Sequence, residues 1–133
     1  DAEIAMVALG STCGTARAVV DELRSQGIKA GLLKIRVFRP FPAEEIAAAL
    51  SKVKAVAIMD RSDMLSSQGG QLFSEIRSAM YESGTKPILA NYIYGLGGRE
   101  ISLEDIRHIF AETKANAAAG KAKQLIQHYG VRE

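Results

Sequence analysis

Ala55-Val56-Ala57-Ile58-Met59-Asp60 is one of four short apolar stretches that decide the fold, because each closes on a turn and leads into a helix. The other three are Ile4–Gly10, Gly31–Ile35 and Ile88–Tyr94. Near-continuous apolar strands are typical of a sheet that is buried on both faces, with helices as its cover. We therefore expect an α/β fold with three layers, α/β/α, around a mainly parallel open sheet of four or five strands.

Apolar residues at helical spacing mark the covering helices. The buried faces that we expect are Ala16, Val19, Val20 and Leu23; Ile46, Ala47 and Leu50; and Leu72, Phe73, Ile76, Ala79 and Met80. A fourth helix is predicted to begin at Ser102-Leu103-Glu104-Asp105, a capping-box pattern with Asp in place of Glu. Residues 1–116 are thus predicted to form one α/β domain, and residues 117–133 a C-terminal helix that packs on it or on a partner.

The bulk composition excludes several classes of function. The chain has 133 residues and a formal net charge of +2, which suits one domain and gives no basic patch for nucleic acid or a membrane surface. No apolar run approaches the roughly 20 residues of a membrane span. Cys13 is the single cysteine, so neither an internal disulfide nor a zinc or iron–sulfur site is expected. The single thiol favours a reducing, cytoplasmic setting. The chain begins at Asp1 without a methionine, so we expect a domain cut from a longer polypeptide, with a trimmed tag as the alternative.

The order of the strands predicts where a ligand would bind. Strand–helix alternation implies parallel pairing, and the order 2-1-3-4 places the turns after strands one and three beside the topological switch point. The candidates at this crevice are Ser11, Thr12, Arg61, Ser62, Gly69 and Gly70. A stand-alone nucleotide- or phosphate-binding module would use them. One observation disfavours this binding function: Thr12 stands where the dinucleotide fingerprint needs its second glycine. A tight turn with a helix cap is therefore the plainer interpretation of Gly10–Gly14.

Chemistry-bearing residues are sparse. Asp60-Arg61-Ser62 ends a strand, where it would suit either a binding crevice or a local ion pair with a turn cap. Cys13 or Asp60 could serve an enzyme, but neither has a second catalytic group nearby in the sequence. His108 and His128 lack metal-ligand spacing. We therefore predict no catalytic residue and no metal ligand.

Two segments are candidates for an interface with neighbouring domains. Arginines and aromatic residues, which are enriched at protein interfaces, gather at Phe38, Arg39 and Phe41. Gly97 and Gly98 with Arg99 allow close packing against another domain or a phosphate contact. The alternative for the arginines is that they lie over their own domain.

Four motifs in order resemble one known family. They are Val7–Thr12, Arg39-Pro40-Phe41-Pro42, Asp60-Arg61-Ser62 and Tyr92–Arg99. They are similar to the second domain of the alpha subunit of pyruvate:ferredoxin oxidoreductase and of related 2-oxoacid:ferredoxin oxidoreductases. The resemblance covers about residues 3 to 113 and implies the fold of the transketolase C-terminal domain, which carries an additional antiparallel edge strand.

The same resemblance implies a function for the parent enzyme. The family oxidatively decarboxylates a 2-oxoacid to acyl-CoA and CO2, using thiamine diphosphate, Mg, [4Fe–4S] clusters and coenzyme A, and passes electrons to ferredoxin. The second domain is an organising domain that packs between subunits. The resemblance therefore implies that this chain binds no cofactor itself and is inactive alone. Its partners would be the other domains and subunits of the enzyme, and the expected substrate of that enzyme is of the pyruvate type.

Overall fold

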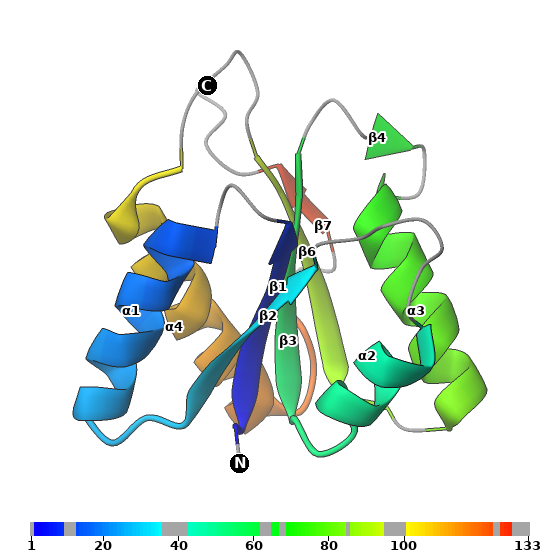
Figure 1. Cartoon of the computed structure of the whole chain (residues 1–133), viewed down its shortest axis with the longest axis horizontal. Coiled ribbons are helices and arrows are strands. Elements are labelled where there is room, and N and C mark those ends of the chain that lie inside the picture. The colour runs from blue at the N-terminus through cyan, green and yellow to red at the C-terminus, as the bar shows by residue number, and fades with distance from the viewer. Residues whose placement is uncertain are drawn as a thin grey trace.

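Parallel strands form the central sheet of the computed structural model, and Figure 1 shows them between two layers of helices. The described residues are 2–9, 13–35, 43–61, 65–66, 69–84, 86–94, 101–123 and 126–128. The strands of this sheet are β1 (Ile4–Leu9), β2 (Ala30–Ile35), β3 (Ala55–Arg61), β6 (Ile88–Tyr94) and β7 (Ile126–His128). Their order is β2-β1-β3-β6-β7, and every pair is parallel.

Two helices cover each face of the sheet. Helices α1 (Cys13–Ser25) and α4 (Leu103–Ala119) pack together on one face, at the left of Figure 1. Helices α2 (Ala43–Leu50) and α3 (Gln71–Ser83) pack together on the other. A short antiparallel pair, β4 (Leu65–Ser66) with β5 (Gly69–Gly70), precedes α3.

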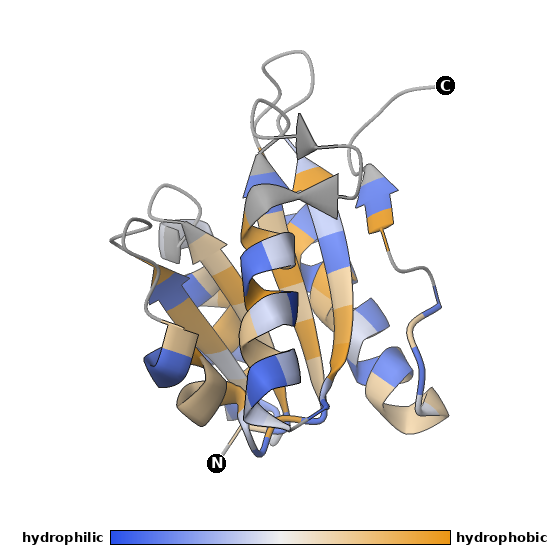
Figure 2. Cartoon of the chain, turned by 90° about the vertical axis from the view of Figure 1, so that its right-hand side faces the viewer, coloured by the Kyte–Doolittle hydropathy of each residue, from blue (hydrophilic) through white to orange (hydrophobic). Residues whose placement is uncertain are grey.

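Alternation along the strands builds two hydrophobic cores. On β1, Ile4, Met6 and Ala8 belong to the core beneath α1 and α4, whereas Ala5 and Val7 belong to the core beneath α2 and α3. Because successive side chains of a strand point to opposite faces, a continuous apolar run serves both layers. Figure 2 shows the same division, with hydrophobic strands inside and hydrophilic residues on the outer surface of the helices.

Capping residues fix both ends of α4. The Ser102 side chain accepts a hydrogen bond from the Asp105 amide, and the Asp105 side chain accepts one from the Ser102 amide, which confirms the predicted capping box. The helix ends at Gly120, whose φ of 80° lies in the left-handed region that glycine adopts without strain.

The predicted strand order and the predicted buried faces of the first three helices are confirmed, and Leu23 is the one member that is only partly buried. One expectation is wrong. The helix expected from about Ala117 is not found among the described residues: α4 runs through Ala119, and the chain then forms β7, which is parallel to β6 and is the fifth strand of the large sheet. Gly120 stops the helix although the alanines around it favour one.

Residue 116, at which the prediction divides the chain, lies inside α4. The division into residues 1–116 and 117–133 stays a prediction.

Candidate functional site

Asp60, at the carboxyl end of β3, is the buried carboxylate beneath the predicted crevice. One of its oxygens accepts a hydrogen bond from the amide of Leu72 at 2.9 Å, and the other accepts one from the amide of Phe73 at 3.1 Å. Asn91 on β6 donates a third at 3.0 Å, and also donates to the Ile58 carbonyl at 2.9 Å. Asp60 thus ties the end of β3 to the start of α3 and to β6.

Burial dominates the acidity of this group. The side chain is 0% exposed, and removal from water raises the pKa of the Asp60 carboxyl above 3.8. The three hydrogen bonds, two of them from amides in the first turn of α3, oppose this shift because they favour the charged form. With both oxygens engaged inside the protein, Asp60 is a structural anchor and not a group directed into a crevice.

The topological switch point lies where the strand order predicts it. The chain leaves β1 for α1 on one face of the sheet and leaves β3 for α3 on the other. Of the crevice candidates, Ser11, Thr12 and Ser62 lie outside the described residues, and Arg61 is described only in its backbone, as the last residue of β3. Gly69 and Gly70 form β5, which lies against α3 and β6.

The remaining predicted positions are scattered over the fold. Cys13 is the first residue of α1, and His128 is the last residue of β7. His108 lies on α4 one turn from Glu112, with 3.3 Å between its Nε2 atom and the Glu112 carboxylate. The interface candidates Phe38, Arg39, Phe41, Gly97, Gly98 and Arg99 lie outside the described residues.

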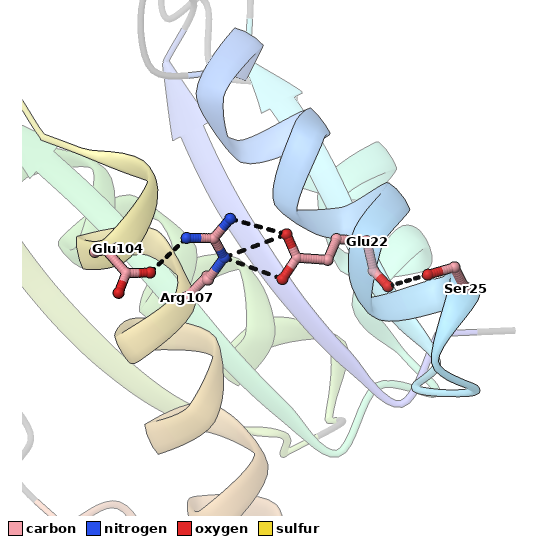
Figure 3. Close-up of polar contacts among 4 residues, drawn as sticks. All are labelled: Glu22, Ser25, Glu104 and Arg107. Carbon is pink, nitrogen blue, oxygen red and sulfur yellow. Dashed lines mark hydrogen bonds and ion pairs between the residues drawn. The ribbon is translucent and has the colours of Figure 1, made fainter.

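An ion-pair network joins the two helices on one face of the sheet. Figure 3 shows the Arg107 guanidinium of α4 between Glu22 of α1 and Glu104 of its own helix. Its Nε atom lies 3.0 Å from Glu22 Oε2, and its Nη2 atom 3.0 Å from Glu22 Oε1. These hydrogen bonds lower the pKa of Glu22 and raise that of Arg107. The side chains are 37% and 40% exposed, so the pair orients the helices more than it stabilises them.

A second polar cluster attaches β7 to the domain. The Glu112 carboxylate of α4 accepts a hydrogen bond from the Tyr92 hydroxyl of β6 at 2.7 Å. It accepts another from the side-chain amide of Gln127, on β7, at 2.8 Å. Burial raises the pKa of Glu112, but these hydrogen bonds and the charges of His108 and Lys123 outweigh it, so the pKa is lowered.

Sequence reasoning missed the residues that position this edge. Asn116 of α4 is 4% exposed, and its side-chain oxygen accepts a hydrogen bond from the Lys123 amide at 3.0 Å, which turns the chain back toward β7. Buried amides such as Asn91 and Asn116 need partners, and an Asn inside an apolar strand or helix face is the one signal that could have indicated them.

The described residues contain neither a membrane-spanning helix nor a metal cluster. No helix in the described ranges combines the length and the apolar character that crossing a membrane requires. Among the same residues, no three His, Cys, Asp or Glu side chains gather closely enough to hold a metal ion.

Similarity to solved structures supports the architecture. A split-gene transketolase, solved as an inactive β4 tetramer, superposes with a TM-score of 0.66 at 16% sequence identity. The match covers 86% of this chain and 39% of that one, and at this identity it shows the fold alone. The α/β/α architecture is therefore transketolase-like.

Similarity to curated proteins reaches much higher identity. The pyruvate synthase subunit PorA of Thermotoga maritima is 44% identical over 100% of this chain and 33% of its own length. The ketoisovalerate oxidoreductase subunit VorA of Pyrococcus abyssi is 40% identical over 97% of this chain and 32% of its own. This chain thus spans about a third of the length of these relatives. A family model for pyruvate:ferredoxin oxidoreductase core domain II matches residues 2–106, and the chain therefore belongs to that family.

Proposed function

We propose that this chain is a non-catalytic organising domain of a thiamine diphosphate-dependent 2-oxoacid:ferredoxin oxidoreductase. The parent enzyme would convert a 2-oxoacid of the pyruvate type to acyl-CoA and CO2. The observation that carries the proposal is family membership over residues 2–106, together with relatives that are named as subunits of pyruvate synthase and ketoisovalerate oxidoreductase.

The cysteine content of the sequence and the buried carboxylate of the described residues do not fit the cofactors of such an enzyme. A [4Fe–4S] cluster needs four cysteine thiolates, and the sequence has one cysteine, Cys13. The Mg²⁺ that accompanies thiamine diphosphate prefers carboxylate and carbonyl oxygens. Asp60 is the buried carboxylate of the described residues, and both of its oxygens already accept hydrogen bonds from α3. The proposal therefore assigns both groups, and coenzyme A, to other parts of the enzyme.

The topology supports one shared face for contact with those parts. The segment with Phe38, Arg39 and Phe41 follows β2, and the segment with Gly97, Gly98 and Arg99 follows β6. Because parallel strands end at the same edge of a sheet, both segments start from one edge. The strands β1 and β3 lie between them, which separates the starting points by about 14 Å at the usual strand spacing. In this proposal they dock on the neighbouring domains or subunits, and ferredoxin meets the enzyme elsewhere.

The first test is cofactor binding by the full chain. We expect isothermal titration calorimetry with thiamine diphosphate and Mg²⁺, in the presence of excess adenosine 5′-diphosphate to occupy any general phosphate site, to give no binding heat. Micromolar affinity would contradict the organising role, because the domain would then hold the reacting group.

The second test is assembly of the parent enzyme. Arg39→Ala and Arg99→Ala are expected to weaken co-purification with the rest of the enzyme and leave the thermal midpoint of the chain unchanged. Arg17→Ala, on the exposed side of α1, is the matched control. If the two variants assemble fully, the proposed docking face is wrong.

A phosphate-binding module at the switch point is the competing function. The position of the switch between β1 and β3 favours it, and Ser11, Thr12, Arg61, Ser62, Gly69 and Gly70 would line it. Ser11→Ala and Arg61→Ala separate the two functions, because a binding module would lose its ligand and an organising domain would lose assembly at most.

A further inference from the structure

A hollow of about 300 Å³ opens at the amino edge of the sheet, opposite the edge that carries the proposed docking face. Three lysines from separate parts of the chain line it: Lys29 after α1, Lys54 before β3, and Lys114 on α4. Among the described residues, Glu3, directly before β1, is the one carboxylate that lines the hollow. We name this feature the lysine hollow.

The sheet fixes two of these lysines on either side of Glu3. The Glu3 amide donates to the Lys29 carbonyl at 2.8 Å, and the Lys54 amide donates to the Glu3 carbonyl at 2.8 Å. The three residues therefore form one row across β2, β1 and β3, with the two lysine backbones about 10 Å apart at the usual strand spacing. Helix α4 packs on β1 and β3 and brings Lys114 to the same hollow.

The charges around the hollow do not balance. Lys54 and Glu3 approach to 3.9 Å with side chains that are 65% and 56% exposed, which makes a weak pair. Neither Lys29 nor Lys114 pairs with a carboxylate in the described part of the chain. The described residues that line the hollow thus carry two positive charges in excess, and a recess with an excess of one sign of charge concentrates ions of the other sign. A bound anion would relieve the repulsion between the lysines.

Apolar residues also line the hollow. Ile4 is 4% exposed and Ile28 is half-buried, and both pack into the core beneath α1 and α4. A volume of about 300 Å³ is at the lower end of the range for small-molecule pockets. Lysine is a common phosphate ligand in proteins. We infer that the lysine hollow binds a small molecule that carries phosphate groups and a compact apolar part. This inference goes beyond the proposed organising role and does not depend on it.

Calorimetry of the full chain at low ionic strength tests the inference, with inorganic pyrophosphate and adenosine 5′-diphosphate as probes. We expect saturable binding with one site, and tighter binding of the nucleotide because apolar residues also line the hollow. Lys29→Gln and Lys114→Gln should each weaken binding about threefold to fivefold, the usual worth of one exposed charge pair. Glu3→Gln should tighten binding, because it removes the carboxylate that competes with the ligand.

Lys52→Gln is the matched control, because Lys52 is exposed, lies two residues before Lys54 and does not line the hollow. Equal weakening by Lys52→Gln would show diffuse charge attraction and overturn the inference. Absence of saturable binding would do the same. Tighter binding of an acidic peptide than of either probe would assign the hollow to a protein segment and would also overturn it. The assembly test with Arg39→Ala and Arg99→Ala does not affect these binding results. Failure of the lysine hollow and failure of the organising role can therefore be told apart.

Discussion

Removal of the Asp60 carboxylate is the sharpest test of how β3, α3 and β6 are joined. Asp60→Ala leaves three buried donors without their acceptor: the amides of Leu72 and Phe73 and one N–H of Asn91. Each orphaned donor costs about 1–3 kcal/mol. Relief of the burial cost of the charge and entry of water into the vacated space offset part of the sum. We expect the free energy of unfolding to fall by about 3–5 kcal/mol.

Urea titration followed by circular dichroism at helical wavelengths measures this loss, since the chain has no tryptophan for fluorescence. Asp60→Asn keeps the size of the side chain but presents an NH2 group to at least one of the donors, so a smaller loss of about 2 kcal/mol is expected. Asp21→Ala, an exposed carboxylate on α1, is the control and should change stability by less than about 0.5 kcal/mol. A loss below about 1 kcal/mol for Asp60→Ala would refute the anchoring role.

The difference in the free energy of unfolding between the wild-type chain and Asp60→Asn should change with pH in one direction. Because burial raises the pKa of Asp60 in the folded protein, the folded chain binds a proton between pH 3.8 and the folded pKa, where the unfolded chain has lost it. The stability that Asp60 contributes is therefore full below pH 3.8 and falls as the pH rises through the folded pKa. The advantage of the wild-type chain over Asp60→Asn should shrink with rising pH, and an advantage that grows would contradict the assigned burial.

Two further substitutions test the edge that carries β7. Gly120→Ala places a methyl group on a residue with φ of 80°, so the free energy of unfolding from urea titration should fall by about 1–2 kcal/mol. Gly14→Ala is the control: a Cβ there meets nothing within 4 Å, and stability should not fall. Tyr92→Phe deletes the hydroxyl that donates to Glu112, so stability should fall by about 1 kcal/mol and the pKa of Glu112 should rise toward its usual value, as NMR titration can show. The lowered pKa means that Glu112 stabilises the wild-type fold above pH 4.5 and loses this effect as the pH falls through the folded pKa, and an unchanged titration would exclude the hydrogen bond.

Local pattern was sufficient to predict the architecture because it is repeated consistently along the chain. Each signal can be recognised within a few residues of sequence. Examples are the apolar runs of β1 and β3 and the helical spacing of Ile46 and Leu50. Right-handed crossovers then leave few topologies, and the order chosen among them for the first four strands of the sheet is the observed one. The edge strand β7 is different: it has three residues, and contacts with Glu112 and Asn116 hold it and the turn before it. No local pattern shows those partners.

The site was predictable only in part. The position of Asp60 at the end of a strand is visible in the sequence, but its partners lie 12, 13 and 31 residues away and are fixed by tertiary packing. The lysine hollow was not predicted for the same reason. Lys29, Lys54 and Lys114 are isolated in the sequence, and only the register of β2, β1 and β3 under α4 brings them together.

The contacts of Asp60 also determine how this fold can change in evolution. The Asp60 carboxylate, on β3, accepts a hydrogen bond from the amide of Leu72, near the start of α3, so the two ends of the stretch between them are held together. For a loop that is already closed, doubling the number of residues costs only about 0.6 kcal/mol of chain entropy. Insertions and deletions should therefore accumulate in this stretch among descendants of a common ancestor, while the aspartate beneath it stays unchanged.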